Sequence, residues 1–111
     1  MAIKLLFSPG EGRILGAQVV GAKGADKRID VLSTSIRAGM TVEDLQDLDL
    51  AYSPQFGSAK DPVNMAGYVA SNILKKDVEV VHWDEIDPLG KDDHVLLDVR
   101  SAPEVKETGV I

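Results

Sequence analysis

The sequence of 111 residues contains no cysteine, which excludes a disulfide, a thiolate nucleophile and a thiolate metal site within these residues. Any thiol chemistry must therefore come from another segment or another chain. Histidine is also scarce: His82 and His94 show neither a paired spacing nor a neighbouring cysteine. A lone histidine is more often a structural or surface group than a ligand, so we assign no metal.

Positive charge is in deficit as well. The formal net charge of -6 argues against a nucleic-acid partner, because such binding depends on clustered Lys and Arg. No apolar run approaches the roughly 20 residues needed to cross a bilayer, and the N-terminus lacks the pattern of a signal peptide. We therefore expect no membrane partner and a cytoplasmic location. The length suits one small domain, with little room for a second complete one.

The first residues predict a β-hairpin. Residues 3–8 place apolar side chains at alternate positions, and residues 14–22 form a second apolar, β-branched run. The segment between them, residues 9–12, contains one proline and two glycines, which is typical of a turn. The chain is therefore expected to open in an antiparallel sheet.

Two amphipathic helices are predicted after the hairpin. The first has apolar residues at spacings of four, three and four, and Gly39 should end it in a left-handed cap. Its apolar residues are Ala25, Ile29, Leu32 and Ile36. Thr41 and Asp44 have the spacing of a capping box for a short helical turn.

The second long helix should run from Asp61 to about Lys75. Asp61 can accept the free backbone N–H groups of the first turn, and Pro62 suits the first helical position. One side of this helix aligns Met65, Val69 and Ile73. Together these elements predict an α+β fold, an antiparallel sheet with two main helices packed on it.

Beyond residue 77 the pattern changes. Residues 78–83 and 95–100 are candidate strands, and residues 84–93 between them are polar and rich in turn formers. We expect residues 1–76 to form one domain and residues 77–111 to form a linker with part of another.

The most specific motif runs from residue 52 to residue 70, YSPQFGSAKDPVNMAGYVA. It resembles the C-terminal signature of the FAD-dependent pyridine nucleotide-disulfide oxidoreductases, in the branch of coenzyme A-disulfide reductases, NADH oxidases and persulfide reductases. The resemblance covers about residues 3–75, and in that family this segment belongs to the domain that makes the homodimer. It implies FAD, NAD(P)H and coenzyme A as cofactors of a larger enzyme, and it implies that the present residues alone are inactive.

The same resemblance gives Tyr52 its role. Tyr52 matches a tyrosine that coenzyme A-disulfide reductases extend into the partner subunit's active site, where a neutral phenol can donate a hydrogen bond or a proton to a developing thiolate. A rim tyrosine with its hydroxyl in water would be the better interpretation of the residue alone. Phe56 stands where related sequences often carry a second tyrosine, so a packing role is expected there.

The remaining candidates surround the start of the second long helix. Lys60 and Asn64 lie where a phosphate-bearing cofactor could dock at a helix N-terminus, although a role of Asn64 in its own turn or at the subunit interface is the better interpretation of that residue. Gly67 costs about 1 kcal/mol relative to alanine in a helix, so close approach of another backbone is expected there, either within the domain or at an interface. The residues expected at the dimer interface are Pro54, Phe56, Pro62 and Gly67.

The end of the sequence carries a second resemblance. Residues 96–100, LLDVR, followed by Glu104 and the TGVI of residues 108–111, resemble the opening of a rhodanese domain, with Val110 in place of the usual histidine. This implies a piece of a longer, fused polypeptide. Two alternatives stay open: an NADH oxidase of the same architecture, and a non-enzymatic α+β module that binds another protein.

Overall fold

The chain forms two units in a computed structural model, which describes residues 1–86, 95 and 97–109. The units comprise Met1–Val80 and Val81–Ile111. The domain boundary predicted between residues 76 and 77 falls shortly before this division.

The first unit begins with the predicted hairpin. Strand β1 (Ala2–Phe7) pairs antiparallel with strand β2 (Ile14–Val20), and the pairing becomes irregular next to Phe7. The turn between them places Gly12 at a φ of 67°, a left-handed conformation that glycine adopts at little cost. The hairpin prediction is confirmed.

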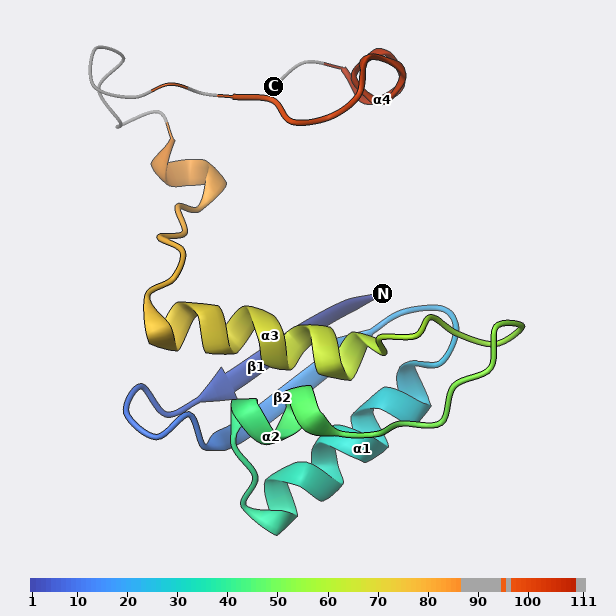
Figure 1. The fold of residues 1–111 in the computed structure, drawn as a ribbon, viewed down its shortest axis with the longest axis vertical. Helices are drawn as coiled ribbons and strands as arrows, with labels where there is room; N and C mark the ends of the chain where they lie inside the picture. The colour runs from blue at the N-terminus through green and yellow to red at the C-terminus, as the bar shows by residue number, and fades with distance from the viewer. Residues whose placement is uncertain (87–94, 96, 110–111) are drawn as a thin grey trace. The chain divides into compact units, whose positions relative to one another are not determined.

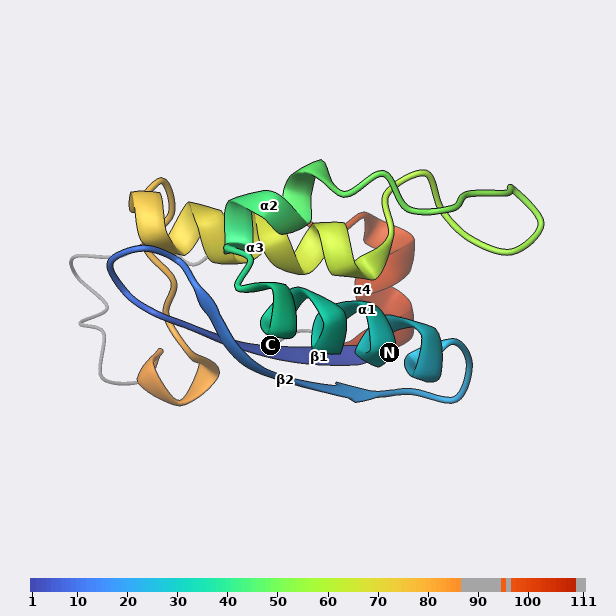
Figure 2. The ribbon, with the colours of Figure 1, turned by 90° about the horizontal axis from the view of Figure 1, so that it is seen from below.

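The two faces of this sheet differ. Alternate side chains of β1, at Ile3, Leu5 and Phe7, are half-buried beneath the helices, whereas Leu6 and Leu15 on the opposite face are exposed. All three helices of this unit cover the same face, which Figure 2 shows most directly. The prediction of an α+β fold is confirmed.

Helix α1 (Ala25–Ala38) packs against β2. Its apolar stripe buries Leu32 completely, and Gly39 ends the helix at a φ of 74°. The Gly39 N–H donates to the carbonyl of Ile36, so the predicted left-handed cap is confirmed.

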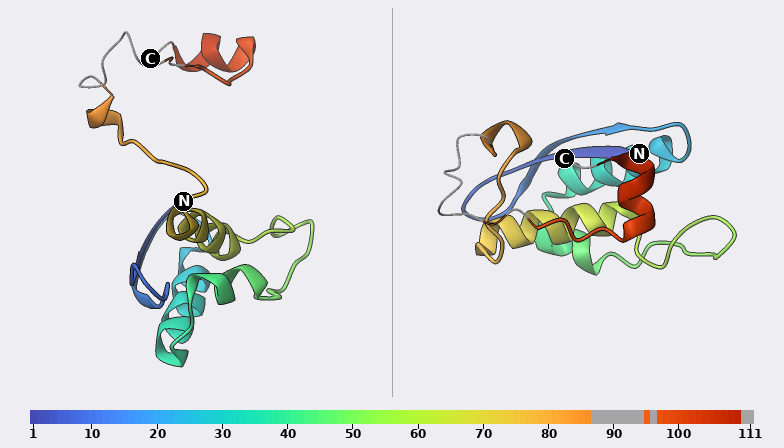
Figure 3. Two further views of the ribbon diagram at one scale, coloured as in Figure 1. Left: turned by 60° about the vertical axis from the view of Figure 1, so that its left-hand side comes forward. Right: turned by 90° about the horizontal axis from the view of Figure 1, so that it is seen from above.

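Two further helices complete the first unit. Helix α2 (Val42–Asp47) begins with the predicted capping box, in which the Thr41 hydroxyl accepts from the Asp44 N–H at 3.2 Å. Helix α3 (Pro62–Lys75) lies along β1 and packs closely on α2. Figures 1 and 3 show these helices from three sides.

The core of the first unit lies where the sheet, α1, α2 and α3 meet. Its fully or almost fully buried apolar residues are Ile14, Leu32, Val42, Leu45, Val63 and Ala70. Every one of these three helices contributes to this cluster, which fixes their positions on the sheet.

The second unit contains a 3-10 turn, η1 (Trp83–Glu85), and helix α4 (Ala102–Thr108). The strand predicted at residues 78–83 is wrong. Residues 78–82 are exposed and lie in no strand, and a strand without a partner leaves its backbone groups unpaired. The strand predicted at residues 95–100 is also wrong for residues 95 and 97–100; residue 96 lies outside the described residues, as do residues 87–93 of the predicted polar segment.

Candidate functional site

The start of α3 is fixed by Asp61. The Asp61 carboxylate accepts a hydrogen bond from the Val63 N–H at 3.0 Å, and the Asp61 N–H donates to the side-chain oxygen of Asn64 at 3.2 Å. Pro62 occupies the first helical turn, where its missing N–H costs nothing. The predicted cap is confirmed in detail.

Arg28 of α1 forms an ion pair with the same carboxylate. Its Nη2 lies 2.8 Å from Asp61 Oδ2, its Nε donates to Oδ1 at 3.3 Å, and the two side chains are only 13% and 10% exposed. Burial alone would raise the pKa of this carboxyl. The hydrogen bonds from Arg28 and Val63 and the positive charge of Lys27 outweigh burial and hold the pKa below its usual value of 3.8. The pair therefore joins α1 to the first turn of α3.

Asn64 is buried, with 4% of its surface exposed. Its amide nitrogen donates to the carbonyl oxygens of Leu45 and Leu48, both at 2.9 Å, while its oxygen accepts from Asp61. Both polar atoms are thus used within the chain, which matches the alternative of a structural role. The cofactor-binding role of Asn64 stays a prediction that this geometry does not support.

Gly67 makes a close contact between helices. A Cβ added at Gly67 would lie 2.9 Å from the Leu45 Cβ, 2.9 Å from the Val42 carbonyl oxygen and 3.1 Å from the Gln46 nitrogen. All three atoms belong to α2, so the expected close approach occurs within the domain. A role for Gly67 at a subunit interface stays a prediction.

The segment between α2 and α3, here called the Tyr52 loop (residues 49–60), stands away from the helices in Figures 1 and 2. Tyr52 is 53% exposed and Phe56 is 89% exposed, and Pro54 is exposed as well. The phenol of Tyr52 is therefore accessible to a second molecule. The catalytic role of Tyr52 and the interface roles of Pro54 and Phe56 stay predictions.

Lys60 lies at the end of this loop. Its ammonium donates a hydrogen bond to the Tyr68 hydroxyl at 3.0 Å and lies 5.2 Å from the centre of the Tyr68 ring. Lys60 is exposed, so its positive charge remains open to an anionic ligand, and its cofactor-binding role stays a prediction.

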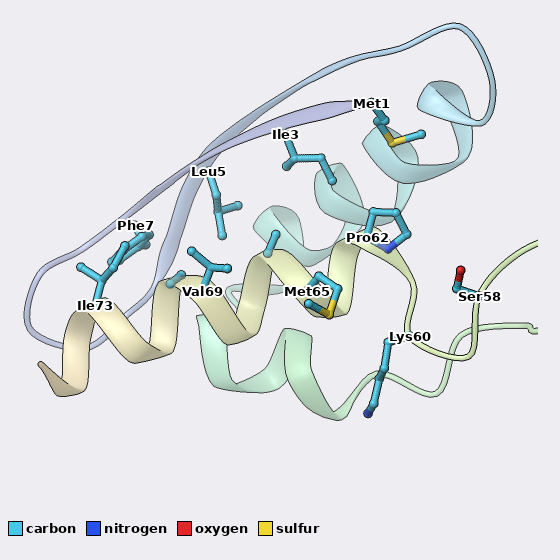
Figure 4. A pocket seen from close by; sticks show the side chains of 12 residues that line it. Met1, Ile3, Leu5, Phe7, Ser58, Lys60, Pro62, Met65, Val69 and Ile73 are labelled. Atoms are coloured by element: carbon cyan, nitrogen blue, oxygen red, sulfur yellow. The ribbon is translucent and has the colours of Figure 1, made fainter. Parts of the chain in front are cut away.

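An open, mainly apolar groove of about 460 Å³ lies between β1 and α3. Figure 4 shows Leu5 and Phe7 of β1 facing Val69 and Ile73 of α3 across it. The side of α3 that the sequence aligned is thus its open side, with Met65, Val69 and Ile73 each 45–57% exposed. Pro62 lines the groove at the N-terminal end of α3.

Within the part of the chain that the structure describes, no three His, Cys, Asp or Glu side chains gather in a group that could hold a metal ion. None of the described helices is both long and apolar enough to cross a membrane.

Sequence reasoning missed two residues of this site, Arg28 and Tyr68. Arg28 lies 33 positions before its partner Asp61, and nothing in the local pattern marks the pair. Tyr68 follows Lys60 by eight residues and meets it because the chain turns into α3 between them. Only the three-dimensional arrangement reveals these contacts.

Comparison with protein families matches residues 1–62 to the family described as "Pyridine nucleotide-disulphide oxidoreductase, dimerisation domain". The chain belongs to this family. The matched residues cover the hairpin, α1, α2 and the Tyr52 loop, and they end at the first residue of α3. The predicted membership is confirmed.

Relatives of known identity extend the match of this dimerisation domain. The coenzyme A disulfide reductase of Staphylococcus aureus (strain JH9) is 41% identical over 68 residues, which are 61% of this chain and 16% of the relative. The chain thus spans about a sixth of the length of such curated relatives.

Two solved structures resemble the dimerisation domain and the residues after it. Reduced Bacillus anthracis CoADR-RHD has a TM-score of 0.83 and 51% identity, and the match covers 95% of this chain and 19% of that one. The NAD-dependent persulfide reductase from A. fulgidus has a TM-score of 0.77 and 46% identity, with 92% and 18% covered. The likeness therefore continues beyond the family match.

Proposed function

We propose that this dimerisation domain belongs to an FAD-dependent NAD(P)H:disulfide or persulfide reductase, where it holds a homodimer and supplies Tyr52 to the partner subunit's active site. The observation that carries the proposal is the combination of family membership with a tyrosine that is 53% exposed on a projecting loop. The named relatives are reductases, which favours a reductase over an oxidase. A cytoplasmic location is part of the same proposal.

In this proposal the other domains of the enzyme supply the electrons, and the present residues supply a hydrogen-bond donor and a positive charge. The flavin and the nicotinamide, bound by other domains, supply the reducing electrons for a coenzyme A disulfide or a persulfide. The phenol of Tyr52 donates a hydrogen bond to the sulfur that gains negative charge. Lys60 offers a positive charge to the phosphates of a coenzyme A molecule. Residues 77–111 form a linker and the start of a rhodanese-like domain.

A chimaeric enzyme tests this function. Residues of this chain replace the 68 matched residues of the S. aureus coenzyme A disulfide reductase, and coenzyme A disulfide turnover is followed by NAD(P)H oxidation. Tyr52→Phe removes only the hydroxyl. It should lower turnover by about a hundredfold, the scale of a proton or hydrogen-bond donor acting in the transition state, and leave folding unchanged. If the chimaera with Tyr52 and the chimaera with Tyr52→Phe turned over equally fast, the role of Tyr52 would be refuted.

The control is Phe56→Tyr in the same chimaera. This substitution adds a hydroxyl to a neighbouring exposed ring of the same loop. If Tyr52→Phe acts through the lost phenol, Phe56→Tyr should not restore turnover in the Tyr52→Phe background. Solution mass from light scattering should show a dimer for each variant.

A further inference from the structure

The Tyr52 loop combines an exposed middle with buried ends. Residues 51–60 are exposed, except Ser53, which is half-buried. The residues that flank the loop, by contrast, contact Asn64, which is 4% exposed, and the exit residue Asp61 is 8% exposed. The loop is therefore anchored beside the core at its two ends and at Leu50, which packs against the core, while residues 51–60 between them stay largely exposed.

One side chain joins the two ends. The Asn64 amide nitrogen donates to the carbonyl of Leu48, directly before the loop, and its oxygen accepts from the N–H of Asp61, directly after it. This fixes the separation of the loop ends and so reduces the number of loop conformations. A second bond from the same nitrogen to Leu45 holds Asn64 against the end of α2.

Arg28 fixes the exit of the loop to a different helix. Two of its nitrogens bond the two oxygens of the Asp61 carboxylate, and its Nη1 donates to the Gly24 carbonyl at 3.2 Å. A forked guanidinium holds a carboxylate in a defined direction, which a lysine ammonium does not. The loop exit is thereby fixed relative to the beginning of α1.

We propose that Arg28 and Asn64 are positioning residues, which hold the Tyr52 loop in one arrangement so that the phenol is presented at a fixed place outside its own domain. This inference rests on the proposed function of Tyr52. A side chain that reacts across a subunit interface must be held close to its productive position, because small displacements sharply reduce the rate. The middle of the loop bonds only locally, from Phe56 and Gly57 to Ser53, and the bond of the loop to α3 comes from its last residue, Lys60, to the Tyr68 hydroxyl, so the placement of the middle depends on the ends.

The Arg28 side chain lies outside the apolar core, whereas Asn64 bonds the backbone of one core residue, Leu45. Neither Arg28 nor Asn64 belongs to the buried apolar cluster, and a change at Arg28 that keeps the charge should leave that cluster packed. Weaker bonds at the two loop ends should therefore increase local opening of the Tyr52 loop more than they increase unfolding of the whole domain. This difference separates a positioning role from a contribution to overall stability.

Arg28→Lys in the present chain tests the inference by amide hydrogen exchange. Lysine keeps the charge but loses the fork, so the amides of Phe56, Gly57 and Asp61 should exchange about tenfold faster, which corresponds to about 1.4 kcal/mol. Amides paired between β1 and β2 should be unchanged. Arg37→Lys is the matched control, because it makes the same chemical change at an exposed site on the same helix.

Two results would overturn the inference: unchanged exchange in the loop, or an equal increase throughout the first unit. Asn64→Ser serves as a second variant, because it removes the amide that donates to Leu45 and Leu48 without burying a charge. This variant should raise the exchange rates of the loop amides and leave those of the amides between β1 and β2 unchanged. This readout requires no turnover, so its failure is distinguishable from failure of the proposed function, which the Tyr52→Phe result decides.

Turnover in the chimaera gives an independent check of positioning. Arg28→Lys should lower the turnover number in the presence of Tyr52 and have no further effect in the Tyr52→Phe background, because residues that act as a unit are not additive. Equal effects of Arg28→Lys in both backgrounds would contradict the inference, since Arg28 would then act independently of Tyr52.

Discussion

Gly67→Ala probes the closest contact between α2 and α3. The new Cβ would lie 2.9 Å from the Val42 carbonyl oxygen and 3.1 Å from the Gln46 nitrogen, closer than ordinary van der Waals contact. Both are backbone atoms, so no side-chain rotation relieves the overlap, and α2 or α3 must move. Overpacking of this kind lowers the free energy of unfolding by about 1–3 kcal/mol. Because two of the contacts are with backbone atoms, we expect Gly67→Ala to cost about 3 kcal/mol from overpacking.

Alanine also favours the helix by about 1 kcal/mol over glycine, which leaves a net loss of about 2 kcal/mol. For a domain of this size, that lowers the midpoint of thermal unfolding by about 8–16 °C. Circular dichroism during heating measures the shift. Gly10→Ala is the control, because nothing lies within 4 Å of a Cβ at Gly10 and its φ is not positive. A Gly67→Ala variant as stable as the wild type, or more stable, would refute the close contact.

Two further substitutions test the helix starts by denaturant unfolding. Asp61→Asn keeps a capping side chain but loses the charge that Arg28 binds, so it should cost about 2 kcal/mol at neutral pH. Because the folded pKa of Asp61 is lowered, its stabilisation is complete above 3.8 and is lost as the pH falls through the folded value. The difference between wild type and Asp61→Asn should therefore narrow below pH 3.8, and a constant difference would contradict the ion pair. Thr41→Ala removes the hydroxyl that accepts from the Asp44 N–H at 3.2 Å, and it should cost about 1 kcal/mol at any pH where the domain is folded. No loss on Thr41→Ala would show that the cap does not stabilise α2.

The local features of the first unit could be predicted because their signals lie within a few residues. Gly39 ends α1, and Asp61 with Pro62 begins α3, since caps are satisfied by near neighbours. The motif around Tyr52 likewise pointed to the family that the comparison then matched. For each of these predictions, the residues that carry the signal lie close together in the sequence.

Long-range arrangement could not be predicted in the same way. The pairing of Arg28 with Asp61 depends on how α1 and α3 lie on the sheet, which periodicity does not specify. The aligned apolar side of α3, which includes Val69, proved to be its open side, because Gly67 contacts α2 and the buried residues of α3 are Val63 and Ala70 of the core. Residues 78–83 have the composition of a strand but no neighbouring strand to pair with.

The most direct test of the central claim, that Tyr52 acts in the partner subunit, is subunit mixing in the chimaeric enzyme. One subunit carries Tyr52→Phe, and the other keeps Tyr52 but carries a substitution outside the present residues that abolishes turnover at its own catalytic centre. Each homodimer should be nearly inactive. If Tyr52 acts across the interface, random exchange of equal amounts should restore about a quarter of wild-type turnover, because half of the dimers then contain one complete site. No recovery in mixtures shown to contain the mixed dimer would contradict the account.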